Sequence, residues 1–376
     1  MISSFKVKGY RKFADFRLDN LNRINFFVGK NNVGKTSLLE AIYGWASGKN
    51  LSPFFWTGSQ RNQNPQNFTA YHIAENIVSS VYTRNIVPFE FELSAITDDN
   101  EITYRHTIAL GDIFKDFIRD VAMNSSISNV NSIFLQNQNQ QFTGNMFAGN
   151  NITIAQWEIE SSDSTKKSFL LNWPNLFMDN VTPQLLASYK DINTHRNMDE
   201  NRNLYTYLKR NNLLNTLIKE MKLVFPKIKS FDILPYNGNS LAPVNVQLIN
   251  DEFFPIDTFG DGLRRFFQII GSLVFYHDSM ICIDEIDATI HPEAQKELGR
   301  NLIVYARKYN VQLFVTTHNL EFIDAFLSAW QEDETLRQRD DIRIITLKDT
   351  ENGLKARTMT GEKALNARES FNLELR

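Results

Sequence analysis

Three apolar runs along the chain have the character of strands that are buried on both faces. They are Ile24–Val28, Met280–Ile283 and Val311–Thr317. Short runs without polar alternation are typical of parallel strands inside a sheet. We therefore expect an α/β protein whose sheet contains these three runs.

Other segments alternate between polar and apolar residues, or repeat with the period of a helix. Helical periodicity is found in Ser37–Trp45, from about Asn203 to Val224, and most clearly between Phe266 and Val274. Residues 50–68 and 124–151 are rich in Asn and Gln, so we expect exposed loops there. The further expected strands are residues 4–8, 15–19, 89–95, 103–109, 152–160, 167–172 and 342–347.

The composition is that of a globular protein. Of the 376 residues 42% are hydrophobic, which suffices for a core and, at this length, allows two or three domains. No apolar segment is long enough to cross a bilayer, and the N-terminus has no secretory hydrophobic region. The single cysteine, Cys282, excludes a disulfide within the chain. These features predict a cytoplasmic protein without a membrane partner.

Directly after the first apolar run, residues 29–36 read Gly-Lys-Asn-Asn-Val-Gly-Lys-Thr and fit the phosphate-binding loop pattern G-x-x-x-x-G-K-[ST]. Such a loop turns backbone N–H groups and a helix N-terminus towards phosphate oxygens. We expect Lys35 to contact the β- and γ-phosphates of ATP and Thr36 to coordinate Mg²⁺. A chance match in a turn is the alternative, and the flanking strand and helix disfavour it. The predicted nucleotide-binding residues of this segment are Gly29, Lys30, Asn31, Asn32, Val33, Gly34, Lys35, Thr36 and Ser37.

Two adjacent carboxylates end the second apolar run, and a histidine follows the third. Asp284 is placed to hold Mg²⁺, and Glu285 to orient and deprotonate the water that attacks the γ-phosphate. His318 could hydrogen-bond the γ-phosphate or that water. The plainer interpretations are two solvated acids and a histidine at a helix start. Together with the phosphate-binding loop, these residues predict ATP hydrolysis, with Glu285 and His318 as the catalytic candidates.

Five motifs occur in an order that resembles the ABC-type ATPase heads, in the variant found among OLD-like and SMC-related cytosolic ATPases. Residues 259–265, Phe-Gly-Asp-Gly-Leu-Arg-Arg, are similar to their signature loop, residues 287–292 to their D-loop, and residues 317–319 to their switch histidine. The resemblance implies an α/β fold with an ABC-ATPase-like P-loop NTPase core, built as a mixed sheet with flanking helices. It also implies nucleotide contacts from Gly260, Asp261 and Gly262.

The same resemblance implies three segments. Residues 1–110 would form the first half of the ATPase core, residues 111–227 an inserted helical or β arm or lid, and residues 228–376 the second half of the core. No sustained heptad repeat is present in the inserted segment, so we do not expect a long coiled-coil rod.

Two departures from the family pattern affect the predicted site. Gly260 stands where the signature normally carries a serine, so a hydroxyl contact to the γ-phosphate is missing. No clear glutamine loop is found, although residues 189–196 lie in the corresponding region. Arg11 resembles an early basic residue that family members place near nucleotide, and a solvated turn residue is the equally weighted alternative.

In ABC-type heads the signature of one chain closes on the ATP that the other chain holds, so the resemblance implies a homodimer or higher oligomer. It further implies that the protein regulates a separately encoded effector, a nuclease or a toxin. Free-standing OLD-like ATPases have this role in bacterial antiphage defence. The alternative is an ATP-dependent DNA clamp similar to RecF-like and SMC-like repair proteins. The net charge of −3 disfavours DNA, although a local basic patch could be formed by Lys209, Arg210, Lys219, Lys222, Lys227 and Lys229. A transporter ATPase subunit fits less well, because the signature departs from the transporter form.

Overall fold

The computed structural model describes residues 1–54, 89–98, 100–111, 152–173, 182–234, 242–351 and 353–371. The loop expected at residues 124–151 and most of the one at residues 50–68 lie outside the described residues. The chain forms two compact units, which we call unit 1 (residues 1–3, 19–39 and 185–376) and unit 2 (residues 4–18 and 40–184). These boundaries differ from the three expected segments, because residues 185–227 pack within unit 1.

Unit 1 contains a mixed sheet of six strands in the order β15-β14-β3-β13-β12-β8. The pairs β8–β12, β12–β13, β13–β3 and β3–β14 are parallel, and β15 is antiparallel to β14. This arrangement confirms the α/β fold class expected from the apolar runs. The strand bounds are β3 (Ile24–Val28), β8 (Ala187–Lys190), β12 (Met280–Ile283), β13 (Gln312–Thr316), β14 (Ile342–Thr350) and β15 (Gly353–Thr360).

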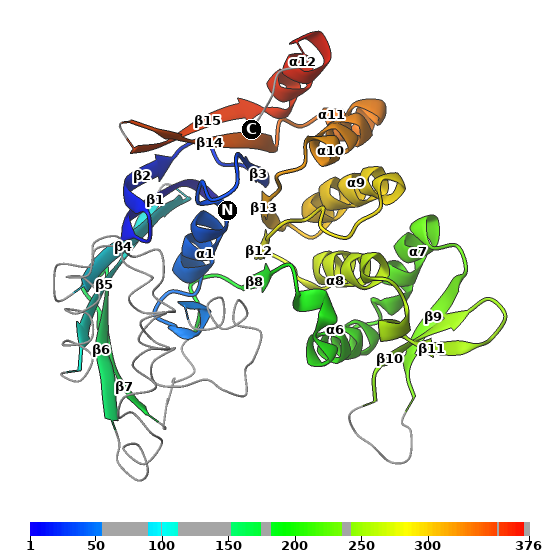
Figure 1. Cartoon of the computed structure of the whole chain (residues 1–376), viewed down its shortest axis with the longest axis horizontal. Helices are drawn as coiled ribbons and strands as arrows, with labels where there is room; N and C mark the ends of the chain where they lie inside the picture. The colour runs from blue at the N-terminus through cyan, green and yellow to red at the C-terminus, as the bar shows by residue number, and fades with distance from the viewer. Residues whose placement is uncertain are drawn as a thin grey trace, which may run out of the picture. The chain divides into compact units, whose positions relative to one another are not determined.

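Three helices follow one face of this sheet: α8 (Asp261–Phe275), α9 (Pro292–Lys308) and α10 (Leu320–Glu332) (Figure 1). Their apolar residues and the central strands form one continuous hydrophobic core. In it the ring of Phe26 on β3 lies 4.6 Å from that of Phe326 on α10, edge to face. The helices thus give the sheet its buried face and hold the carboxyl ends of its strands in fixed positions.

The prediction of a single helix from about Asn203 to Val224 is wrong. The structure has α6 (Met198–Arg210) and α7 (Leu214–Val224) instead. Asn212 between them has a φ of 57°, a left-handed conformation that ends a helix and that asparagine tolerates better than most residues. Both helices pack near α8, together with a small antiparallel sheet in the order β11-β10-β9. Its strands are β9 (Ile228–Ile233), β10 (Val244–Leu248) and β11 (Phe253–Pro255).

Unit 2 is built on an antiparallel sheet in the order β2-β1-β4-β5-β6-β7. The strands expected here from alternation are all present, each with slightly longer or shifted ends. Its core is aromatic: the rings of Phe91 and His106 stack at 4.3 Å, and the indole Nε1 of Trp157 donates to His106 Nδ1 at 3.2 Å. The strand bounds are β1 (Ile2–Tyr10), β2 (Phe13–Leu18), β4 (Phe89–Thr97), β5 (Asn100–Leu110), β6 (Ile152–Ser161) and β7 (Lys166–Trp173).

Short elements complete the described chain. Helix α1 (Lys35–Ala46) follows the phosphate-binding loop, and the single-turn η2 (Thr194–Arg196) and η3 (Ile256–Thr258) precede α6 and α8. The last helices are α11 (Glu334–Arg337) and α12 (Gly361–Phe371). Within the described ranges, none of the helices combines the length and the hydropathy needed to span a membrane.

Candidate nucleotide-binding site

The phosphate-binding loop joins the end of β3 to the start of α1, as the sequence predicts. Its backbone is left-handed at Asn32, with a φ of 62°, and has a φ of 106° at Gly34. Gly29 has a φ of 146°, and a Cβ there would lie 2.6 Å from the carbonyl oxygen of Leu347 on β14. The first glycine is therefore required by the neighbouring strand as well as by the shape of the loop.

Lys35 lies inside this loop rather than in solvent. Its Nζ donates to the carbonyl oxygens of Gly29 at 2.8 Å and Lys30 at 2.9 Å. Burial lowers the pKa of Lys35, and the neighbouring carboxylates Glu285 and Asp284 act in the opposite direction. The loop therefore holds a cation close to the two acids at the end of β12.

Three side chains converge at the point where β12, β13 and α1 meet. The hydroxyl of Thr36 donates to Asp284 Oδ1 at 3.1 Å, and the hydroxyl of Thr316 donates to the same oxygen at 2.5 Å. A hydroxyl beside a carboxylate supplies the hard oxygen ligands that Mg²⁺ prefers. The described residues contain no group of three or more His, Cys, Asp or Glu that could cage a metal. Mg²⁺ typically takes one or two protein ligands and completes its shell with phosphates and water.

Glu285 follows in a constrained backbone conformation. Its φ is 47°, which is uncommon for a residue other than glycine, and its N–H donates to the Thr316 hydroxyl at 2.8 Å. The buried guanidinium of Arg265 on α8 donates to the carbonyl oxygens of Asp284 at 2.7 Å and Glu285 at 2.8 Å. Two neighbouring elements thus fix the backbone that carries this partly exposed side chain.

A second threonine ties the next turn to β13. The Thr317 hydroxyl donates to Asp287 Oδ1 at 2.5 Å and accepts from the N–H of Asn319 at 3.0 Å. Asn319, rather than His318, caps α10, since its side chain accepts from the N–H of Glu321. His318 lies exposed between these two anchored residues. The sequence-based interpretation missed the threonines, although the pair directly before His318 was the available signal.

The two signature glycines have different surroundings. Gly260 precedes α8, and a Cβ placed there would meet nothing within 4 Å. A Cβ on Gly262 would lie 2.8 Å from the carbonyl oxygen of Thr289, in the segment that resembles a D-loop. Asp261 starts the helix, and its carboxylate accepts hydrogen bonds from Arg196 and Arg264. Within one chain, then, the signature is packed against the D-loop segment at Gly262 and is sterically open at Gly260.

Arg11 belongs to unit 2, where it forms an ion pair with a buried glutamate. Its guanidinium lies 2.8 Å from the carboxylate of Glu40, and the backbone φ of Arg11 is 49°. Its nucleotide contact remains a prediction, as do the roles of the other site residues.

Comparison with known proteins shows the family to which the chain belongs. Residues 24–324, more than half of the chain, match the family model described as "AAA domain, putative AbiEii toxin, Type IV TA system". The chain belongs to this family. It is accordingly a P-loop ATPase, and the prediction of an ATP-using enzyme is confirmed at that level.

Individual relatives and a solved structure are similar to this chain. The chain is 21% identical over 374 residues to a Helicobacter pylori protein named "ATP/GTP phosphatase", covering 96% of both proteins. A stretch of 50 residues is 43% identical to the DNA replication and repair protein RecF of Coxiella burnetii, which is 13% of this chain and 14% of that one. Among solved structures, an Smc head bound to the C-terminal winged-helix domain of ScpA matches with a TM-score of 0.52 and 12% identity, over 97% of this chain and 99% of that one. The fold is therefore that of an SMC head.

Proposed function

We propose that this protein is an ATP-hydrolysing switch: two copies close on two ATP molecules and open after hydrolysis, and in doing so control a separately encoded effector in antiphage defence. The observation that carries the proposal is the convergence of Thr36, Asp284 and Thr316 beside the buried Lys35. These residues come from segments far apart in the sequence, and they supply a phosphate cradle, oxygen ligands and a positioned carboxylate at one place.

Each group has a defined task in hydrolysis. Lys35 and the loop N–H groups bind the phosphates, and Thr36 and Asp284 are the ligands offered to Mg²⁺. When bound, Mg²⁺ neutralises charge on the phosphate oxygens. Glu285 orients the attacking water and accepts its proton, while His318 lies at the end of β13 to hydrogen-bond the same water or the γ-phosphate. The backbone bonds of Glu285 to Thr316 and Arg265 fix the main chain that carries its carboxylate before substrate arrives.

The proposed dimer is based on the signature segment at the N-terminus of α8. The N-terminus of α8 carries orphan N–H groups and a positive dipole end, and Gly260 leaves this end open. A γ-phosphate held by a second copy would satisfy those donors. ATP therefore stabilises the closed pair, and cleavage removes the contact that favours closure.

The ATPase test uses Glu285→Gln, which keeps the shape of the side chain and removes its proton acceptor. With ATP and Mg²⁺ we expect a stable dimer by light scattering after gel filtration, and no dimer for Lys35→Ala under the same conditions. A Glu285→Gln chain that stays monomeric with saturating ATP would contradict the dimer, and wild-type turnover in both variants would contradict the assignment of the site.

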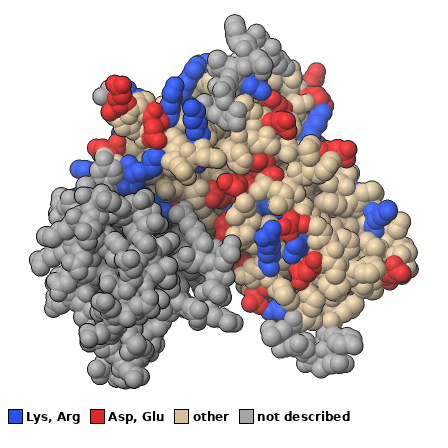
Figure 2. Space-filling view, in the orientation of Figure 1, with Lys and Arg blue, Asp and Glu red and all other residues tan. Residues whose placement is uncertain are grey.

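A DNA clamp is the second candidate, and two observations favour it: the short RecF similarity and the SMC-head fold. The distribution of surface charge disfavours a DNA clamp. Figure 2 shows basic side chains in small groups interspersed with acidic ones over the described part of one face. Two members of the expected basic patch are paired, Lys209 with Asp232 at 2.9 Å and Lys229 with Asp251. Pairing with acids reduces the positive field that DNA would need.

Purification of tagged Glu285→Gln from its native host with ATP and Mg²⁺ separates the two candidates. A stoichiometric nuclease or toxin that is recovered with Glu285→Gln and lost with Lys35→Ala would support effector control. Recovery of the chain alone with nuclease-protected duplex DNA would replace this proposal with the clamp.

A further inference from the structure

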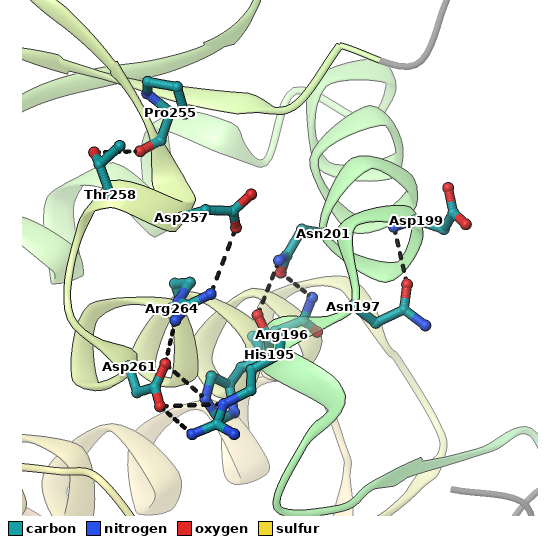
Figure 3. Close-up of polar contacts among 11 residues, drawn as sticks. His195, Arg196, Asn197, Asp199, Asn201, Pro255, Asp257, Thr258, Asp261 and Arg264 are labelled. Atoms are coloured by element: carbon teal, nitrogen blue, oxygen red, sulfur yellow. Dashed lines mark hydrogen bonds and ion pairs between the residues drawn. The ribbon is translucent and has the colours of Figure 1, made fainter. Parts of the chain in front are cut away.

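A cluster of cationic side chains surrounds the first residue of the signature helix. Asp261 Oδ2 accepts from Arg196 Nε at 3.1 Å and from a terminal nitrogen of the same guanidinium, and Asp261 Oδ1 accepts from Arg264 (Figure 3). Arg264 also lies 3.5 Å from Asp257. Arg196 comes from η2, in the segment that follows β8, so two distant parts of the chain meet at the N-terminus of α8.

Arg196 is the accessible member of this cluster. Its side chain is 56% exposed, whereas that of Arg264 is 15% exposed. A guanidinium has five N–H donors in a planar fork, and a single carboxylate oxygen occupies only two of them. Arg196 can therefore hold Asp261 and present further donors to an anion arriving from solvent.

A buried histidine points to the same place. The side chain of His195 is 1% exposed, and neither ring nitrogen has a hydrogen-bond partner among the described residues. Its Nε2 is directed at Asp261 Oδ1 across 3.5 Å, too far for a normal hydrogen bond (Figure 3). Leaving a buried polar group without a partner is unfavourable, so an acceptor brought by a ligand would stabilise this nitrogen.

The segment that carries Arg196 and His195 is fixed to α8 from both sides. Arg265 donates to the carbonyl oxygen of Asp191 at 2.8 Å, and Gln268 donates to Asn201 Oδ1 at 2.6 Å. Asn201 in turn donates to the carbonyl oxygen of His195 at 3.0 Å. Arg196 is thereby carried by a segment that is positioned relative to the helix N-terminus before any ligand binds.

We propose that Arg196, with His195 behind it and the N–H groups of the first turn of α8, forms a phosphoryl-binding site that receives the γ-phosphate of ATP held by a second copy of the chain. The site takes the place of the hydroxyl that is missing at Gly260. Arg196 forms charge-assisted bonds to the phosphoryl oxygens, while Asp261 orients its guanidinium. This inference rests on the proposed ATP-bound dimer and names the residue through which one copy senses nucleotide in the other.

An arginine gives this site a selectivity that the helix N-terminus alone does not have. Backbone donors bind any anion, but a planar guanidinium pairs with two phosphoryl oxygens at once and loses that pairing when the γ-phosphate leaves. Contacts made in the ATP state and absent in the ADP state are what a switch requires.

The test mixes two defective chains. We expect Arg196→Ala to bind ATP as tightly as wild type and to lose about 10²-fold in turnover, because an arginine on transferring phosphate is usually worth this much or more. The second chain is Glu285→Gln, which forms the ATP-bound dimer, keeps an intact signature and lacks the proton acceptor. In a mixed dimer of the two, the loop of the Arg196→Ala chain, with its own Glu285, meets the signature of the Glu285→Gln chain. When the chains are mixed before ATP is added, random pairing should restore about one quarter of the phosphate that wild type releases in the first turnover, since half of the dimers carry one working site of two.

Restoration in the mixture supports action on the second copy. No restoration, with both chains folded by circular dichroism, would overturn the inference, because an arginine that serves its own chain or only the fold cannot be supplied by the partner. Wild-type turnover in Arg196→Ala would overturn it as well. Arg196→Gln serves if the alanine variant does not fold, and Arg337→Ala, which removes another exposed ion-paired arginine of unit 1, is the matched control. A Glu285→Gln dimer that forms normally while the mixture fails would reject this site and leave the proposed function standing.

Discussion

Unit 1 and unit 2 both bury polar side chains, and they do so in different ways. In unit 1, Thr36, Asp284 and Thr316 are linked in a chain of hydrogen bonds that ends at Glu285, whose backbone is left-handed. In unit 2, His106 lies against aromatic rings, and among the described residues its ring accepts one hydrogen bond, from the indole of Trp157. A buried polar residue is therefore no sign of a functional site by itself. A functional site is indicated when several such residues from distant segments are hydrogen-bonded together beside strained backbone.

The largest effect should come from Glu285→Gln, because it changes chemistry and leaves the hydrogen-bonded chain intact. We expect ATP turnover to fall by about 10²–10⁴-fold, the usual contribution of a general base. The thermal midpoint should stay within a few degrees of wild type, since the backbone contacts of residue 285 remain. A phosphate-release assay and a melting curve measure the two, and a large loss of stability would mean that Glu285 belongs to the fold as His106 does.

Arg265→Met should affect both turnover and stability. The substitution keeps the volume and leaves the carbonyl oxygens of Asp191, Asp284 and Glu285 without their donor. Buried acceptors that lose a charged donor predict a drop of about 3 kcal/mol in the free energy of unfolding. Turnover should fall while the Kd for ATP is kept, because the phosphate-binding loop is not touched. Urea unfolding and nucleotide titration test this, and unchanged unfolding would show that the three bonds add no net stability.

His106 should make unit 2 sensitive to acid. Burial lowers the pKa of His106 from 6.5 to about 3, so the folded state keeps the ring neutral. The unfolded chain binds the proton first as the pH falls, and the stabilisation present above pH 6.5 is lost on the way to about pH 3. At pH 5 the loss should reach about 2 kcal/mol relative to pH 7.

His106→Gln is the matched variant, because its amide oxygen can still accept from Trp157 and it cannot be protonated. Its unfolding free energy should change less between pH 7 and pH 5 than that of wild type. ATP turnover at pH 7 should be unchanged, which would separate this buried polar group from those of unit 1. An equal pH dependence in both proteins would assign the acid sensitivity elsewhere.

The smallest effects should distinguish the two signature glycines. Gly262→Ala brings a Cβ to 2.8 Å from the carbonyl oxygen of Thr289, and the rearrangement should cost on the order of 1 kcal/mol. Gly260→Ser meets nothing within 4 Å and should leave the unfolding free energy within about 0.5 kcal/mol of wild type. Chemical denaturation measures both, and a destabilised Gly260→Ser would contradict the open surroundings described here.

Much of the site was accessible from local sequence. The phosphate-binding loop, the two carboxylates and the histidine each directly follow an apolar run, and in a parallel sheet such runs end at the same edge. The contacts of Thr316 and Arg265 were not found, although Thr316 belongs to the threonine pair before His318 and Arg265 ends the signature segment. Their importance depends on which backbone they face. The break at Asn212 was missed for a related reason, since the apolar periodicity continues across it and only the backbone dihedral shows the turn.

The sequence by itself determined the class of protein and the chemistry at its core. A fixed spacing of Gly29, Gly34, Lys35 and Thr36 specifies a phosphate-binding turn, because that geometry depends on neighbours along the chain. The tertiary structure decided which residues of the separate motifs lie in contact. Only packing brings Arg196 to Asp261, Arg265 to Glu285 and Thr316 to Asp284, because contacts between residues tens or hundreds of positions apart are set by the order of strands and the packing of helices, which no local pattern records.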